Sequence, residues 1–188
     1  MVRAFLSDEE QQAWYGMLEA HDALQRALDS RLLAEHRLPL SAFEALMHIA
    51  HAEAGTISIS DLADRVRLSP SQVSRLAIEL ERDGLIQRRR SPADSRSTHA
   101  VITEQGRARL GEAAPAYLAT IRAYLFDPLT EREIRQLARI WQKTKASRPP
   151  AAREDNRRQP RGAAARVPPA TARWPVPEEE KHHELRRR

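Results

Sequence analysis

The chain contains no cysteine and no apolar run approaching the roughly 18 residues that a membrane-spanning helix needs. The missing cysteines exclude disulfide scaffolds, cysteine-ligated zinc and thiol redox switches. The first ten residues, MVRAFLSDEE, lack the apolar segment of a secretory signal peptide. We therefore expect a cytoplasmic protein that makes no use of a membrane.

Catalytic motifs are missing as well. Gly106 and Gly111 have the spacing of a phosphate-binding loop, but Glu112 and Ala113 stand where that loop needs Lys and Ser or Thr. The chain has no nucleophile elbow, and its Ser, His and Asp residues form no recognisable catalytic arrangement. We expect neither an enzymatic activity nor a cofactor.

Charge is present but unevenly distributed over the 188 residues, a length that suits one or two small domains. Residues 1–64 carry 4 basic and 11 acidic groups, whereas residues 65–109 carry 10 basic and 5 acidic groups. Residues 146–188 carry 11 basic and 6 acidic groups. The internal basic block and the basic C-terminal segment favour nucleic acid as a partner.

The composition changes abruptly at residue 146. Residues 146–188 contain seven prolines, much Ala and Arg, and few apolar side chains. Such a segment cannot bury enough surface to offset its ordering entropy, so we expect a disordered basic tail rich in Pro, Ala and Arg. The tail could contact DNA backbone beyond the main site, or it could be inert or bind another partner.

Residues 1–145 contain many helix-start signals. Four capping boxes are expected, in which the N-cap side chain and the side chain three residues later exchange hydrogen bonds with the backbone. They are Ser7–Glu10, Ser41–Glu44, Ser69–Gln72 and Thr130–Glu133. Ser60 and Thr103 are two further candidate N-caps, and Thr56–Ile59 is compatible with a short strand.

The order of elements in the middle of the chain is informative. A short helix over Asp61–Val66 is followed by a tight turn and by a well-capped helix that begins at Pro70. Gly84 can end that helix in the left-handed conformation. Leu85–Arg90 and Ala100–Thr103 then read as the strands of a β-hairpin. We predict a mainly α fold with a small β-hairpin wing, that is, a winged helix-turn-helix.

This arrangement suits DNA, because the first residues of a recognition helix meet base edges in the major groove. Gln72 can pair with adenine and Arg75 with guanine, while Arg96 at the hairpin tip suits a narrow minor groove. The ordinary explanations are a good helix cap and a solvated strand edge, but their combination in this order favours DNA. The candidate contacts are Ser69, Ser71, Gln72, Ser74, Arg75, Arg88, Arg90, Arg96 and Ser97.

Three motifs carry a family resemblance. They are the Gly84-Leu85-Ile86 run ending at Arg88, the sequence Asp94-Ser95-Arg96-Ser97, and Thr103 followed three residues later by Gly106. In this order the chain resembles the MarR family of bacterial transcriptional regulators over about residues 7–145. The tail lies outside the resemblance.

The resemblance implies a homodimer that binds a pseudo-palindromic operator in double-stranded DNA. Residues 1–36 and 104–145 would form the helical dimerisation region and residues 37–103 the winged helix-turn-helix. The wing arginine would be Arg96, with Asp94 orienting it or Arg88. Apolar stripes on the first and last helices independently favour a dimer, since no further domain covers them; packing as a bundle within one chain is the alternative.

The resemblance also implies release from DNA by a small anionic or phenolic ligand. The candidate cleft residues are Trp14, His21, Met47, His48 and His51. Trp14 and Met47 are equally explained as core, and the histidines as ordinary satisfied or exposed side chains. His48 and His51 have the spacing of two metal ligands on one helical face, but no third ligand accompanies them, so we expect no metal.

Two functions from different classes therefore remain at this stage. The first is a sequence-specific, ligand-responsive repressor that acts as a homodimer. The alternative is a DNA-binding architectural protein with little sequence specificity and no small-molecule effector.

Overall fold

The computed structural model describes residues 5–66, 68–90 and 97–147. Its helices and strands follow in the order α1 (Asp8–His36), α2 (Leu40–Ala50), a 3₁₀ turn (Glu53–Gly55), β1 (Thr56–Ser58), α3 (Ile59–Arg65), α4 (Pro70–Arg82), β2 (Ile86–Arg90), β3 (Thr98–Ile102), α5 (Glu104–Ile121), a π-helical turn (Arg122–Phe126) and α6 (Glu131–Ala146). The expected mainly α fold with a small β wing is confirmed. The last helix ends one residue inside the segment predicted to be the tail.

The three strands form one antiparallel sheet in the order β1-β3-β2. In β2 and β3, Ile86 pairs with Ile102 and Arg88 pairs with Ala100, which confirms the predicted hairpin. The short strand β1 adds to the other edge of β3, where Ile57 also pairs with Ala100. Strand β3 is therefore paired on both of its edges.

The predicted helix starts are confirmed at Ser7, Ser69 and Thr130, each of which forms a full capping box, and at Thr103, whose hydroxyl caps α5. Two other predictions were wrong. Ser41 lies inside α2, which starts at Leu40, where the backbone N–H donates instead to Oδ1 of Asp29 on α1 at 2.9 Å. The cap of α3 is Ser58 and not Ser60, because the Ser58 hydroxyl accepts the Asp61 N–H.

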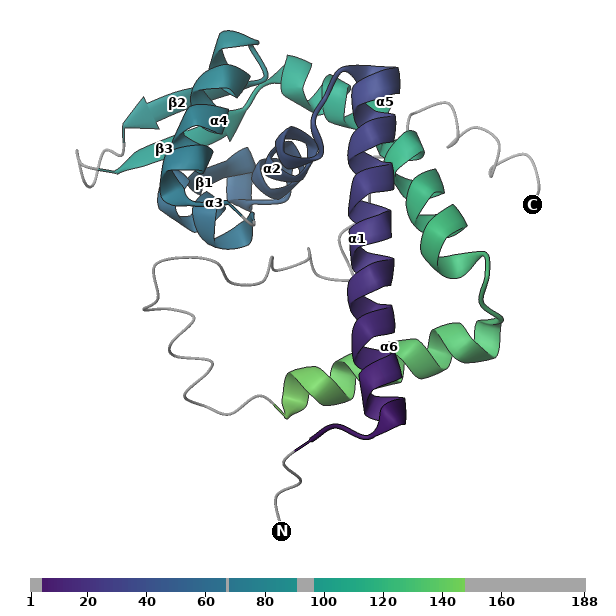
Figure 1. The fold of residues 1–188 in the computed structure, drawn as a ribbon. Helices are drawn as coiled ribbons and strands as arrows, with labels where there is room; N and C mark the ends of the chain where they lie inside the picture. The colour runs from purple at the N-terminus through teal and green to yellow at the C-terminus, as the bar shows by residue number, and fades with distance from the viewer. Residues whose placement is uncertain (1–4, 67, 91–96, 148–188) are drawn as a thin grey trace, which may run out of the picture.

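The core is built around α2. Phe43, Leu46 and Ile49 are completely buried, and the Phe43 ring stacks on Tyr117 of α5 at 4.5 Å between centroids. In Figure 1, α2, α3, α4 and the sheet lie together on one side of α1, the later part of α5 lies on the other side, and α6 runs across the view near the N-terminal end of α1. Helices α1 and α5 pack on each other and carry the winged helix-turn-helix.

The N-terminal part of α1 and all of α6 are poorly covered by the rest of the described chain. No residue of α6 is buried, although Ile140 and Trp141 are apolar. Trp14 and Tyr15 on α1 are also about half exposed. No described helix combines the length and the apolar character required to cross a bilayer.

Candidate nucleic-acid interface

Helix α4 is fixed in place at its start and along one face. The Ser69 hydroxyl accepts the Gln72 N–H at 3.3 Å, and the Gln72 side-chain oxygen accepts the Ser69 N–H at 2.8 Å. Val73, Leu76, Ala77 and Leu80 are buried and form the inner face of the helix. A helix held by its cap and its apolar face presents the opposite face in a fixed orientation.

The predicted DNA contacts on this helix fall into two groups, those whose side chains take no part in the capping box and one whose side chain forms part of it. Ser71, Ser74 and Arg75 are exposed and lie away from the buried face, as predicted. Gln72 is exposed too, but the capping box occupies its side-chain oxygen. The amide of Gln72 can therefore not offer both its donor and its acceptor to an adenine without losing that cap.

Arg88, a predicted DNA contact, is engaged by Glu81 of α4. Its Nε donates to Glu81 Oε2 at 2.7 Å, and its backbone N–H donates to Glu81 Oε1 at 2.8 Å. These hydrogen bonds from Arg88, the backbone one first, lower the pKa of Glu81. The pair ties β2 to the recognition helix and offsets the Arg88 charge, whereas Arg90 is exposed at the end of the strand.

Three predicted contacts meet between α4 and the sheet. Ser74, Arg88 and Ser97 line a hollow of about 250 Å³, together with residues of α3 and β3. The structure thus brings the start of the wing against the first half of the recognition helix. The wing residues Asp94 and Arg96 lie outside the described residues.

A compact joint sets the position of the hairpin relative to α5. The Thr103 hydroxyl donates to the Gly84 carbonyl at 2.7 Å and accepts the Gly106 N–H at 3.0 Å. The Thr103 N–H donates to the Leu85 carbonyl at 3.1 Å. Gly84 has a φ of 73°, in the left-handed region that favours glycine, so the predicted helix end is confirmed.

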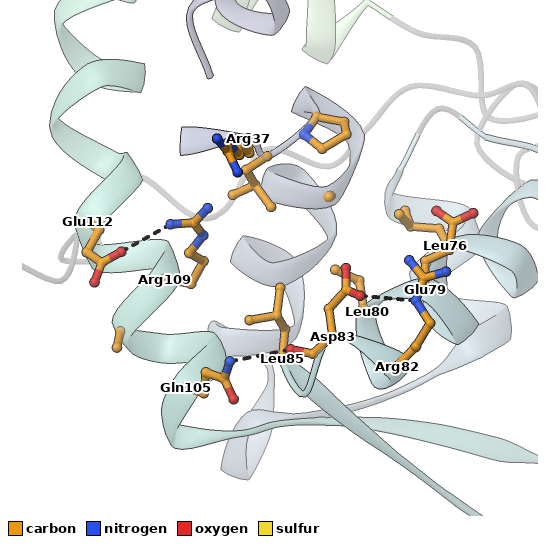
Figure 2. Close-up of a pocket in the computed structure, with 14 residues that line it drawn as sticks. Arg37, Leu76, Glu79, Leu80, Arg82, Asp83, Leu85, Gln105, Arg109 and Glu112 are labelled. Atoms are coloured by element: carbon orange, nitrogen blue, oxygen red, sulfur yellow. Dashed lines mark hydrogen bonds and ion pairs between the residues drawn. The ribbon is translucent and has the colours of Figure 1, made fainter. Parts of the chain in front are cut away.

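A groove of about 610 Å³ separates the C-terminal half of α4 from the start of α5 (Figure 2). Leu38, Leu76 and Leu85 contribute apolar surface to its lining. Charged side chains of both signs also line it: Arg109 pairs with Glu112 at 3.3 Å and Arg82 pairs with Asp83 at 3.2 Å. The remaining lining residues are Arg37, Pro39, Ala42, Glu79, Leu80, Gln105 and Ala108.

The five residues predicted for a ligand cleft do not line this groove. Met47 and His48 are buried on α2, and His51 Nδ1 lies 2.7 Å from the Met47 carbonyl oxygen. Trp14 and His21 lie on exposed parts of α1. A ligand at these five residues stays a prediction.

Burial lowers the pKa of His48 to about 4, with smaller contributions from Arg65 and His51. His48 is therefore neutral near pH 7, as a core histidine would be. Within the described ranges, no three His, Cys, Asp or Glu side chains gather in a way that could hold a metal ion.

Comparisons with known proteins agree with this geometry. Residues 37–97 match the MarR family. The repressor MdtR of Bacillus subtilis is 33% identical over 89 residues, which are 47% of this chain and 57% of MdtR. The repressor MprA of Escherichia coli is 31% identical over 114 residues, or 61% of this chain and 64% of MprA. The chain thus matches less than two thirds of the length of these relatives.

The fold extends the likeness beyond the matched segments. The structure of Sco3205, a MarR family transcriptional regulator from Streptomyces coelicolor in complex with DNA, superposes with a TM-score of 0.69 and 26% identity. The superposition covers 78% of this chain and 96% of Sco3205. Residues 37–97 therefore match the MarR family, and the described chain has the fold of the MarR-family winged helix-turn-helix structures to which it is similar.

Proposed function

We propose that this chain is a sequence-specific repressor that binds a pseudo-palindromic operator as a homodimer and is released by a small anionic or phenolic ligand. The observation that carries the proposal is the recognition helix, whose exposed face presents Ser71, Ser74 and Arg75 while its cap and buried face hold it rigidly. The repressor activity of MdtR and MprA supports the direction of regulation.

Operator binding requires that Arg75 contribute to base readout. In an operator selected from random duplex DNA by the purified protein, Arg75→Ala should weaken binding by about 1–3 kcal/mol, because a bidentate contact with guanine is lost. On random-sequence DNA the same substitution should cost much less. Fluorescence anisotropy at one fixed salt concentration measures both affinities.

Arg89→Ala is the matched control for charge. Arg89 is exposed on β2, outside the recognition helix, and donates to Gln87 at 2.8 Å. Its loss should affect specific and random DNA to a similar extent. Equal losses on both DNAs for Arg75→Ala would instead favour the architectural alternative.

The dimer is supported by the uncovered apolar faces. Residues 1–36 and 104–145 would form its interface, since α6 is amphipathic yet has no buried residue in the single chain. A second copy related by a two-fold axis would cover these faces with the same surface. The two recognition helices would then meet successive major grooves, roughly 34 Å apart.

The groove beside α4 supports the effector part of the proposal. It lies between the recognition helix and α5, so a ligand there would contact both the DNA-reading part and the proposed dimerisation region (Figure 2). Its leucines suit an aromatic body, and Arg37 at its edge makes no ion pair within the described part of the chain. A ligand that prefers one orientation of α4 shifts the DNA equilibrium by that difference in affinity.

Filling the groove should abolish the ligand response. We expect a member of a panel of small aromatic acids and phenols to raise the thermal midpoint of the wild-type protein and to weaken operator binding. Ala108→Phe places a ring in the groove and should remove both effects. Ala34→Phe, at an exposed alanine of α1 outside the groove, should retain them. Retention of both effects in Ala108→Phe would place the effector elsewhere.

A further inference from the structure

One exposed side chain on the recognition helix, Ile78, is not among the predicted DNA contacts. Ile78 is 50% exposed, and among the described residues of the winged helix-turn-helix, 37–103, no other large apolar side chain is exposed to this degree. The other exposed apolar side chains lie on α1 and its N-terminal approach, on the π-helical turn and on α6. Ile78 is therefore separate from the faces that a second copy would cover.

Ile78 lies in the middle of the outward face of α4. At 100° per residue, one row of side chains stands opposite the buried face of the helix. This row consists of Ser71, Arg75, Ile78 and Arg82. The packing of α4 on α3 and β2 uses the other side of the helix. Gln72 lies on the flank of the row and not within it.

Neither local stability nor packing accounts for an isoleucine at this position. A β-branched residue is a poorer helix former than Ala, Arg or Glu, and half of the side chain gains nothing from burial. The rest of the outward row is polar or positively charged. An apolar side chain in this row gains from burial only against an apolar group on the molecule that the row contacts.

In the major groove that apolar group is the 5-methyl of thymine. We propose that Ile78 is a specificity-determining residue that selects thymine in each operator half-site by contact with this methyl group. The inference rests on the proposed function, because it requires α4 to enter the major groove. Ile78 lies about 4.5 Å along the helix axis from Arg75, so the thymine should lie within about two base pairs of the guanine that Arg75 reads.

The test removes single methyl groups from the DNA. The probe is the duplex that the wild-type protein selects from random sequence, with each thymine replaced in turn by deoxyuridine, which pairs identically but lacks the methyl. One symmetry-related pair of thymines should show a threefold to tenfold loss of wild-type affinity for each methyl removed. With Ile78→Ala the same replacement should cost less than twofold, so the two changes should not be additive.

Ser71→Ala is the control, because Ser71 belongs to the same row but lies two turns away. It should retain the full sensitivity to that thymine methyl. Thermal unfolding should show Ile78→Ala to be folded, since Ala suits an exposed helix position at least as well. If the wild-type protein selects an operator but no thymine methyl couples to Ile78, the inference is overturned. If no operator is selected at all, the proposed function fails first.

Discussion

Replacing Gly106 by alanine destabilises the chain by about 3 kcal/mol, because α5 approaches the end of α4 too closely to admit a side chain. A Cβ at Gly106 would overlap the Leu85 carbonyl oxygen and lie 3.0 Å from Ile102 Cγ1. The Leu85 carbonyl cannot move away freely, since it accepts the Thr103 N–H. Relief would require α5 to separate from the turn that starts the wing. Denaturant unfolding of the two proteins measures the difference.

Gly111→Ala is the matched control in the same helix. Apart from its chain neighbours and the backbone of its own helix, no atom lies within 4 Å of a Cβ built at Gly111, so the substitution meets only the intrinsic preference of a helix for alanine. It should stabilise the chain by about 0.5–1 kcal/mol. A Gly106→Ala protein as stable as the wild type would show that α5 can separate from the Leu85 turn at little cost in free energy.

Introducing a carboxylate on the apolar face of α6 dissociates the proposed dimer. Trp141 follows Ile134 and Leu137 along one face of α6 and is 41% exposed. In Trp141→Glu a charge would be buried against the second copy, which is costly without a partner. Sedimentation at micromolar protein should show a monomer. Operator affinity should fall by about a hundredfold or more, because the two half-sites would no longer be bound together.

Gln142→Glu adds the same carboxylate one residue away, on the polar face of α6. It should leave both the oligomeric state and operator binding close to those of the wild type. A Trp141→Glu protein that still sediments as a dimer would contradict the proposed interface. The full-length chain, including residues 148–188, is the appropriate material for both variants.

Local sequence chemistry predicted most of the elements correctly. Ser7, Ser69 and Thr130 start helices because their capping partners lie only three residues away. Gly84 ends α4 because glycine tolerates a positive φ. These signals act over one helical turn, so they do not depend on the rest of the fold.

The predicted start of α2 was wrong because a distant residue replaced the local cap. The start of α2 is capped by Asp29, eleven residues earlier on another helix, and therefore Ser41 is not needed as a cap. Arg88 stays a predicted DNA contact, and the structure adds its pair with Glu81 across the α4–β2 turn. Neither pairing has a short-range signature in the sequence.

The outward face of α4 could be predicted because helical periodicity also acts over neighbouring turns of one helix. Helical periodicity placed Ser71, Ser74 and Arg75 outward, and the same periodicity could have pointed to Ile78, which a search for polar contacts passes over. The groove beside α4 is different, because it exists only where the C-terminal end of α1, the end of α4 and the start of α5 converge. No segment of the sequence contains it.

The helix caps, the order of the elements and the basic middle block predicted a winged helix-turn-helix from the sequence alone. Such features act locally or through composition, so the order of residues suffices to evaluate them. Only the tertiary structure decided which arginine is neutralised by Glu81, why Gly106 must lack a side chain, and where a groove opens. Each of these depends on the distance between atoms that are far apart along the chain.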